Sequence, residues 1–330
     1  MHYYVGIDIG GTKMAAVMMM DSGRIISRLK VSTPDQANPK NILACLVTLI
    51  EELKSSSSVK SSEIKGIGVG VPGIVDTDKG HILAAPNIRL TGFPLSEHLK
   101  KKYRTKIILA NDVNAGLLGE AWLGAARGFN HVVGIFPGTG VGGAALVNGH
   151  LILGAQGAAT ELGHMIMHIN GPLCHCGNRG CLEALTSRWA IERDIRALIK
   201  KGRKSIIKDL NKGSLTTIKS RVLKEALQKN DRVAKTVLKQ VAVSLGQASV
   251  SINHIFNPQA IVLGGGVIKA CGFFMLPIIK KTLQADPFFK RFNTCQIFQS
   301  SLGDDAVPLG AVRLVQTTSR RDFTIHPLVF

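Results

Sequence analysis

Residues 4–20, YVGIDIGGTKMAAVMMM, contain two apolar runs of strand length that are separated by a glycine turn. The first run is Tyr4–Ile9, the second is Lys13–Met20, and Gly10-Gly11-Thr12 joins them. A phosphate-binding P-loop has the order G-x-x-x-x-G-K-[ST] and opens a helix, whereas here Thr precedes Lys and a strand-like run follows. The stretch therefore predicts a β-meander whose first corner is a glycine turn.

A second stretch repeats this pattern about 130 residues further along the chain. Val132–Phe136 and Ala144–Val147 are strand-like, and the glycine-rich segment Pro137–Gly143 lies between them. Two such units indicate a duplicated fold with phosphates held between its halves, because backbone N–H groups at a glycine turn can bind phosphate oxygens. A third cluster, Gly264–Gly266, follows the strand-like Ala260–Leu263, and its backbone can approach a flat ring or a ribose closely.

The composition is that of a soluble globular protein with room for two domains: 330 residues, 45% hydrophobic and 19% charged. The net charge is +19, but Lys and Arg are scattered and only 5% of the residues are aromatic, so we expect no nucleic-acid partner. Glycines and prolines interrupt the long uncharged stretches 128–160 and 241–268, so neither predicts a membrane-spanning helix. No signal peptide precedes the first strand, and we expect a cytoplasmic protein.

The glycine stretches DIGGTK and GTGVGG resemble those of the ROK family of sugar kinases and repressors, in the actin-like ATPase superfamily, over Tyr4 to Val315. The resemblance implies a duplicated two-domain α/β fold of the actin-like (ribonuclease H-like) type, with a cleft between the domains and a structural zinc loop. It also implies ATP and Mg²⁺, with Asp8 reaching the Mg²⁺ through water. The nucleotide-binding residues would be Asp8, Gly10, Gly11, Thr12, Lys13, Gly138, Thr139, Gly140, Gly142, Gly264, Gly265 and Gly266. Pro137 departs from the pattern, because a strand residue is expected before the second glycine run.

The segment 163–183, GHMIMHINGPLCHCGNRGCLE, holds a metal-ligand pattern. One imidazole and three thiols within 18 residues match a closed tetrahedral Zn²⁺ site, namely His164, Cys174, Cys176 and Cys181. A disulfide is the alternative, but a cytoplasmic chain disfavours it. His168 or His175 could replace His164 in principle, and the resemblance implies His164. The other cysteines, Cys45, Cys271 and Cys295, lie in apolar surroundings and are predicted to be ordinary buried thiols.

Asp112 is the candidate catalytic base. It lies where a strand-like run, Ile107–Asn111, gives way to a helical one, Ala115–Trp122, so it could equally cap that helix. In the ROK pattern this Asp takes the proton from the attacking sugar hydroxyl, and Asn111 hydrogen-bonds the sugar. The resemblance implies a substrate-binding set of Gly73, Asn87, Asn111, Asp112, Glu161, His164 and Glu183. His164 would ligate zinc through one ring nitrogen and face the sugar with the other.

The sequence predicts an N-terminal α/β domain over 1–115, to which a helix at about 308–317 returns, and a larger α/β domain with the zinc loop over 116–307. The tail 318–330 has no assigned role. We expect a homodimer. The predicted function is that of an ATP-dependent hexose kinase, with glucose as first choice, converted to glucose 6-phosphate.

Other substrates and another class of protein remain open. N-acetylmannosamine, N-acetylglucosamine and fructose kinases use a nearly identical polar set, and polyphosphate is a possible alternative donor. A sugar sensor without turnover is the non-catalytic alternative. DNA-binding ROK repressors carry a winged helix-turn-helix domain ahead of the kinase-like part, and we expect none here because the chain begins at the first strand.

Overall fold

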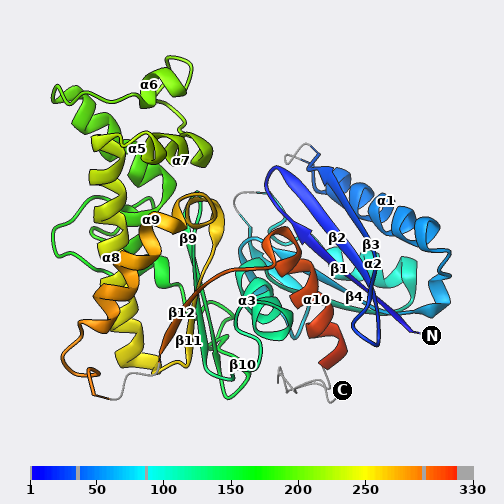
Figure 1. The fold of residues 1–330 in the computed structure, drawn as a ribbon. Coiled ribbons are helices and arrows are strands. Elements are labelled where there is room, and N and C mark those ends of the chain that lie inside the picture. Colours follow the sequence, from blue (N-terminus) through cyan, green and yellow to red (C-terminus); the bar gives the residue numbers. More distant parts are fainter. Residues whose placement is uncertain (1, 35–37, 86–87, 292–294, 318–330) are drawn as a thin grey trace. The chain divides into compact units, whose positions relative to one another are not determined.

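The computed structural model describes residues 2–34, 38–85, 88–291 and 295–317 (Figure 1). The predicted substrate residue Asn87 and the tail lie outside the described residues. Contacts divide the chain into two compact units. Unit 1 comprises the described residues of Met1–Asn130, Ala144–Thr160 and Ser301–Phe330, and unit 2 comprises those of His131–Gly143 and Glu161–Ser300. The predicted domain limits at 115 and 307 remain a proposal.

Unit 1 is built on a five-stranded mixed sheet with the order β3-β2-β1-β4-β7. The strands are β1 (Tyr3–Ile9), β2 (Lys13–Met20), β3 (Ile25–Ser32), β4 (Ile64–Val71) and β7 (Lys106–Asn111). β2 is antiparallel to β1 and β3, whereas β1, β4 and β7 run parallel. The predicted meander is therefore present, with the first glycine turn between β1 and β2. A separate hairpin pairs β5 (Ile74–Asp76) with β6 (His81–Ala84).

Strand β2 is apolar along most of its length because both faces of the sheet are buried at this strand. Successive side chains point to opposite faces of a sheet, and both faces of this one are covered. Ala16 and Met18 join the core beneath helix α1 (Pro39–Ser57) and helix α2 (Leu95–Tyr103). Val17 and Met19 pack on the other face, toward α3 (Asp112–Leu123) and α10 (Ala306–Thr317). Figure 1 shows α1 and α10 on opposite sides of the strands.

The second sheet repeats the topology of the first. Its order is β10-β9-β8-β11-β12, formed by β8 (Val132–Pro137), β9 (Val141–Val147), β10 (His150–Leu151), β11 (Ala260–Leu263) and β12 (Gln296–Gln299). The third strand again pairs antiparallel with the second, and the first, fourth and fifth again run parallel. This repetition confirms the predicted duplicated fold. β9 begins three residues earlier than the predicted Ala144, so Gly142 lies in a strand and the turn shortens to Gly138–Gly140.

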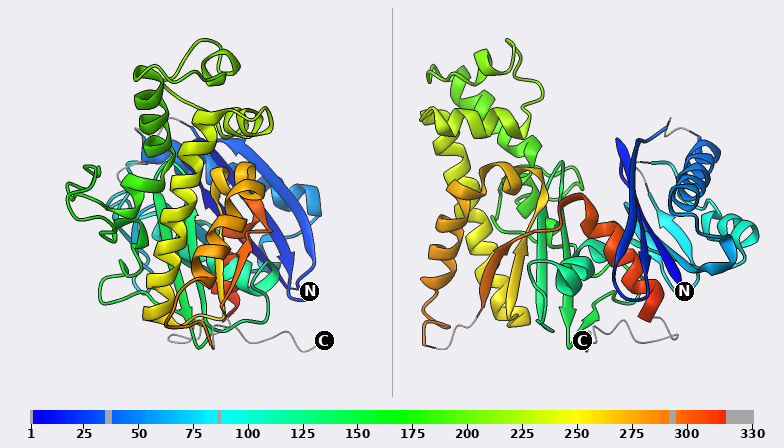
Figure 2. Two further views of the ribbon diagram at one scale, coloured as in Figure 1. Left: turned by 60° about the vertical axis from the view of Figure 1, so that its left-hand side comes forward. Right: turned by 45° about the vertical axis from the view of Figure 1, so that its right-hand side comes forward.

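The remaining helices of unit 2 are α4 (Leu182–Thr186), α5 (Arg188–Lys200), α6 (Ile207–Leu210), α7 (Ser220–Gln228), α8 (Arg232–Phe256) and α9 (Gly265–Gln284). Short 3₁₀ turns are η1 (Ser61–Glu63) and η3 (Gly303–Asp305) in unit 1 and η2 (Leu162–His164) in unit 2. The long helices α8 and α9 pack side by side (Figure 2). Among the described residues, no helix is both long and apolar enough to cross a membrane.

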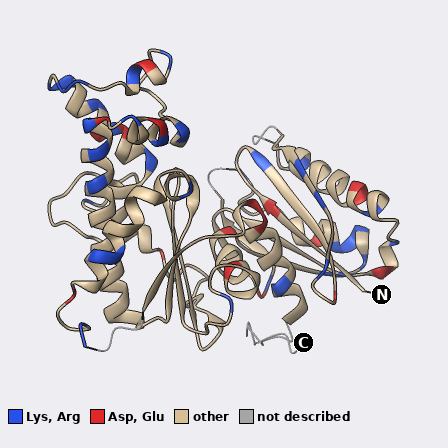
Figure 3. Ribbon diagram, in the orientation of Figure 1, with Lys and Arg blue, Asp and Glu red and all other residues tan. Residues whose placement is uncertain are grey.

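The basic residues are concentrated in one segment of the sequence. Residues 188–239 hold 16 of the 41 Lys and Arg residues but only 5 of the 22 Asp and Glu residues. This segment forms helices α5 to α8 of unit 2 and the connections between them, where Figure 3 shows many cations. Lys and Arg are therefore less scattered than we expected, and the basic run Lys200–Lys208 belongs to this segment.

The backbone of helix α10 packs directly against the backbones of α3 and β1 in unit 1, at positions that are occupied by glycine. A Cβ at Gly310 would lie 1.7 Å from the carbonyl oxygen of Ala115 in α3, and one at Gly6 in β1 would lie 1.9 Å from that of Pro308. The buried Glu120 of α3 accepts hydrogen bonds from the backbone N–H groups of Ser301 and Leu302, which precede α10. The helix starts at Ala306, two residues before the predicted 308, because Pro308 is tolerated in a first turn.

The close approach at Gly310 predicts a large loss of stability for Gly310→Ala. The added methyl overlaps a backbone carbonyl that cannot move without shifting α3, so we expect the free energy of unfolding to fall by about 3 kcal/mol or more in urea denaturation. Gly116→Ala in α3 is the matched control, because its Cβ would meet Val307 at an ordinary 3.4 Å. The control should lie within about 1 kcal/mol of the parent chain. Equal stability of the two variants would contradict this packing.

Candidate active site and metal cluster

Two aspartates lie at one edge of the sheet in unit 1. Asp8 of β1 is in register with Gly70 of β4, which is in register with Ala110 of β7. Asp112 follows β7 directly, and the carboxyl ends of parallel strands meet at the same edge of a sheet. The two carboxyl groups interact: burial, and next the Asp112 carboxylate, raise the pKa of Asp8 to about 7.

Asn111, and not Asp112, caps helix α3. Its side-chain Oδ1 accepts a hydrogen bond from the backbone N–H of Asn114 at 3.0 Å. Its Nδ2 donates to the carbonyl oxygen of Gly73 at 2.8 Å and to Oδ1 of Asp112 at 3.2 Å. The alternative interpretation of Asp112 as the N-cap is therefore wrong, and the helix starts at Asp112 instead of the predicted Ala115. Asn111 thus helps to hold the Asp112 carboxylate in place.

The Gly73 carbonyl depends on a glycine at that position. Gly73 has φ +127°, and a Cβ there would lie 1.9 Å from the carbonyl oxygen of Ala84. Any other residue would therefore be both strained and overlapping. The predicted substrate residue Gly73 consequently reaches the site through its backbone, which fixes the amide of Asn111.

The first glycine turn is exposed and closed by its own backbone. The N–H of Gly10 donates to the carbonyl oxygen of Lys13 at 3.1 Å, and Gly11 and Thr12 are exposed at its tip. The Lys13 ammonium pairs with Asp304 at 2.8 Å, and Lys30 pairs with the same carboxylate at 3.0 Å. These two lysines lower the pKa of Asp304 to about 2. Asp304 was missed at the sequence level, since its role depends on a contact with a strand nearly 300 residues earlier.

The second glycine turn is held by Glu183 of unit 2. The turn closes through the N–H of Gly138, which donates to the carbonyl oxygen of Gly140 at 2.8 Å. Oε2 of Glu183 accepts the backbone N–H of Val141 at 3.0 Å. A Cβ on Gly140 would lie 2.4 Å from the same oxygen, so the carboxylate packs directly on the turn. Glu183, predicted as a sugar ligand, therefore also fixes the backbone of the second turn.

The third glycine cluster lies beside the second turn. Gly264 is the N-cap of α9, and Gly265 adopts φ +82°. A Cβ on Gly265 would lie 2.2 Å from the carbonyl oxygen of Pro137, at the end of β8. Pro137, which differs from the family pattern, is the last residue of β8. Its carbonyl group packs against Gly265, the first residue of α9.

Four predicted metal ligands converge in unit 2. One ligand atom from each of His164, Cys174, Cys176 and Cys181 lies within 4.8 Å of the others. The Sγ atoms of Cys176 and Cys181 are 3.7 Å apart, and Sγ of Cys174 is 3.9 Å from Nδ1 of His164. Tetrahedral Zn²⁺ with bonds of about 2.3 Å to sulfur places its sulfur ligands about 3.8 Å apart. The donor set therefore fits a zinc ion.

The chemistry of the cluster agrees with a cation and not with a disulfide. All six cysteines are free. Burial raises the pKa of Cys174 to about 12 and also raises the pKa of Cys181, so a nearby cation is needed to hold both as thiolates. His175 is outside the cluster and stacks on Trp189, with ring centroids 4.4 Å apart.

Glu183 connects the metal cluster to the glycine turn. Its Oε1 lies 3.6 Å from Sγ of Cys174, and its Oε2 binds the N–H of Val141. The same carboxyl group therefore contacts a predicted metal ligand and the predicted phosphate-binding turn. Elsewhere, the prediction for the other cysteines was partly wrong: Cys271 is buried, but Cys45 and Cys295 are half-buried.

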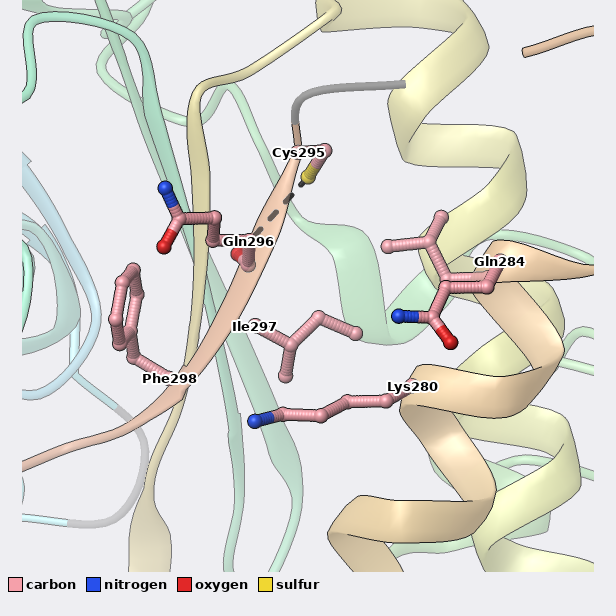
Figure 4. A pocket seen from close by; sticks show the side chains of 7 residues that line it. Lys280, Gln284, Cys295, Gln296, Ile297 and Phe298 are labelled. Atoms are coloured by element: carbon pink, nitrogen blue, oxygen red, sulfur yellow. Dashed lines mark hydrogen bonds between the residues drawn. The ribbon is translucent and has the colours of Figure 1, made fainter. Parts of the chain in front are cut away.

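A pocket lies between α9 and β12, away from these residues (Figure 4). Lys280 and Gln284 of α9 line it together with Cys295, Ile297 and Phe298, on or beside the edge strand. None of the predicted site residues lines this pocket. It therefore contributes nothing to the candidate active site.

Comparison with known proteins identifies the family. A family model for ROK matches residues 4–318. The chain belongs to the ROK family. A glucokinase of Thermotoga maritima is 33% identical over 94% of this ROK chain and 96% of its own length. A xylose repressor of Caldicellulosiruptor bescii is 29% identical over 94% of the chain and 77% of its own length. A crystal structure of a ROK family glucokinase from Streptomyces griseus in complex with glucose and AMPPNP aligns with a TM-score of 0.80 at 29% identity, covering 96% of this chain and 100% of that one.

The raised pKa of Asp8 predicts that Asp8→Asn stabilises this ROK protein at high pH. A carboxyl group whose pKa is higher in the folded than in the unfolded state makes folding less favourable as pH rises from about 4 to about 7. Removing the charge should therefore raise the free energy of unfolding at pH 8 by on the order of 1 kcal/mol, and the gain should vanish near pH 4.

Asp304→Asn is the control with the opposite sign. The pKa of Asp304 is lowered in the folded state, so its ionised form adds stability above pH 4 that is lost as pH falls toward 2. This variant should be less stable than the parent chain at pH 8. Urea unfolding at pH 4, 6 and 8 measures both effects, and an Asp8→Asn variant that is less stable at pH 8 would contradict the assigned environment.

Proposed function

We propose that this ROK protein is an ATP-dependent hexose kinase that transfers the γ-phosphate of ATP to glucose and forms glucose 6-phosphate. The observation that carries the proposal is the placement of Asp8 and Asp112 at one edge of the first sheet, with an exposed glycine turn directly after Asp8. The similarity to a glucokinase, and to a glucokinase structure with glucose and AMPPNP, supports both the reaction and the sugar.

Asp112 acts as the general base in this proposal. Its carboxylate accepts the proton of the sugar 6-hydroxyl while the oxygen–phosphorus bond forms and the bond between the γ-phosphorus and the ADP oxygen breaks. Asn111 supplies the N-cap of α3, and Oδ1 of Asp112 accepts hydrogen bonds from the backbone N–H of Val113 at 2.9 Å and from Nδ2 of Asn111. These bonds fix the orientation of the carboxylate.

The glycine segments bind the nucleotide. In this proposal, backbone N–H groups of the turns at Gly10–Thr12 and Gly138–Gly140 hold phosphate oxygens, except those of Gly10 and Gly138, which close the turns. Gly264–Gly266 would border the adenosine. Asp8 and Lys13 complete this set, with Lys13 able to leave Asp304 because that pair is exposed. Mg²⁺ bound with ATP would supply positive charge beside the transferred phosphate, and Asp8 would hold this ion through water.

A set of polar groups would bind the sugar. We propose the backbone of Gly73 and the side chains of Asn111, Glu161, His164 and Glu183, together with Asn87, which lies outside the described residues. His164 would serve two roles: its Nδ1 lies 3.9 Å from Sγ of Cys174, and its Nε2 would face the sugar. The finer choice between glucose and N-acetylmannosamine, N-acetylglucosamine or fructose depends on this set.

His164, Cys174, Cys176 and Cys181 would hold a structural zinc ion. All four positions are filled by protein, so zinc would order the loop and would not activate water. Two glycines help the loop to turn around the cluster: Gly177 and Gly180 adopt φ +96° and +75°, which only glycine adopts readily.

We also propose that the protein forms a homodimer. Sugar sensing without turnover is the non-catalytic alternative, since a xylose repressor is among the relatives.

The zinc assignment predicts one tightly bound metal ion per chain. Cys176→Ser should reduce the metal content well below one equivalent and lower the melting temperature by about 10 °C, because the loop would lose the cross-link that the metal supplies. Elemental analysis and thermal unfolding measure these effects. Cys45→Ser is the control and should keep the metal. A parent chain that folds and unfolds identically with and without a chelator would disprove a structural metal.

The kinase assignment is tested by ADP release with MgATP against glucose, fructose, mannose, N-acetylmannosamine and N-acetylglucosamine. We expect turnover with glucose, and a loss of about 10²–10⁴-fold in kcat for Asp112→Asn with sugar binding partly retained. Asp209→Asn, an exposed acid on α6, is the matched control. Absence of turnover with all five sugars in zinc-replete protein would favour polyphosphate as the donor or a sensor role.

A further inference from the structure

Helix α5 begins against the second glycine turn. Ser187 caps the helix by accepting the N–H of Ala190, and the backbone N–H of Arg188 donates to the carbonyl oxygen of Gly138 at 2.9 Å. The segment that follows the last cysteine of the metal cluster therefore ends on the turn. This brings Arg188, which the sequence did not assign to any site, to the predicted phosphate-binding turn.

The Arg188 guanidinium contacts the tip of the turn. Its Nη2 donates to Oγ1 of Thr139 at 2.8 Å, and Thr139 is exposed. In the described part of the chain, no carboxylate forms an ion pair with this guanidinium. An arginine has five N–H donors, and among the described residues the guanidinium of Arg188 uses a single donor, on a neutral hydroxyl.

The two other arginines of α5 show the contrast. Arg193 is paired with Asp194 at 2.8 Å and lies 5.5 Å from the centre of the Trp189 ring. Arg196 donates to the carbonyl oxygens of Leu215 and Thr216. Both of these side chains have evident structural partners. Arg188 alone among them reaches the predicted phosphate-binding turn, which indicates a role in binding an anion.

We propose that Arg188 binds a phosphate oxygen of the donor nucleotide beyond the α-phosphate. The inference rests on the proposed function, in which the turn at Gly138–Gly140 holds phosphates. A planar guanidinium suits phosphate oxygens, with which it can form two parallel hydrogen bonds. Thr139 assists, because a hydroxyl that accepts a hydrogen bond from Arg188 keeps its own proton for donation to the same phosphate.

The shape of the turn does not depend on the Arg188 side chain. Glu183 holds the N–H of Val141, and the Gly138 carbonyl is bound by the backbone N–H of Arg188. Both bonds survive replacement of the guanidinium. A variant at this position therefore removes a charge from the turn and leaves its backbone anchored, which separates phosphate binding from a merely structural effect.

The test compares Arg188→Gln and Arg188→Lys with Arg193→Gln, which removes a paired charge from the same helix. Loss of a charged hydrogen bond should raise the KM for MgATP about 10- to 100-fold in Arg188→Gln, with the KM for glucose unchanged. Arg188→Lys, which keeps the charge, should lie between, and Arg193→Gln should stay within about twofold of the parent chain. A KM for MgATP in Arg188→Gln within twofold of the parent value would overturn the proposal.

Direct binding keeps this inference separate from the kinase assignment. Calorimetry with AMPPNP and with AMP needs no turnover. Arg188→Gln should weaken AMPPNP binding by the same 10- to 100-fold and leave AMP binding unchanged, because AMP lacks the outer phosphates. If the parent chain binds AMPPNP but phosphorylates no sugar, the kinase proposal is wrong. Weaker binding of AMPPNP, but not of AMP, by Arg188→Gln would then still support a phosphate contact for Arg188. Equal weakening of AMP and AMPPNP, or no weakening of either, would overturn the inference, and Arg188→Lys provides the same readout if the glutamine variant does not fold.

Discussion

The structure of unit 1 depends on the contact of helix α10 with α3 and the sheet beneath it, at a separation that only glycine permits. Gly310 lies against the backbone of Ala115, and Gly6 lies against that of Pro308. Glu120 adds a buried carboxylate that binds the chain just before α10. Because α3 begins at Asp112, the same contact that closes the core also sets the position of the proposed base.

In unit 2, the corresponding constraint is the carboxyl group of Glu183. One oxygen faces Cys174 of the metal cluster, and the other binds the backbone of the second glycine turn. A structural zinc ion would therefore stabilise more than its own loop, since the segment from Cys181 to Arg188 connects the metal ligands to the predicted phosphate site. Metal content and nucleotide affinity are expected to change together for this physical reason.

Features that depend on local sequence could be predicted, and features that depend on distant contacts could not. The glycine turn after Ile9, the duplicated meander and the four metal ligands are encoded in short, specific patterns. The pairing of Lys13 with Asp304 and the burial of Glu120 join residues far apart in the sequence, so no local signal indicates them. The sequence left open whether Asp112 caps α3, because Asn111 and Asp112 have similar capping preferences, and the geometry assigns the cap to Asn111.

The most direct test of the account is a crystal structure of the protein with glucose and AMPPNP. We predict that a carboxylate oxygen of Asp112 lies within about 2.6–3.2 Å of the glucose 6-hydroxyl, with the γ-phosphate of AMPPNP on the far side of that hydroxyl. The metal site should contain zinc bound by His164 and the three cysteines. A ternary complex in which Asp112 makes no contact with the sugar, or in which another carboxylate occupies that position, would contradict the central claim.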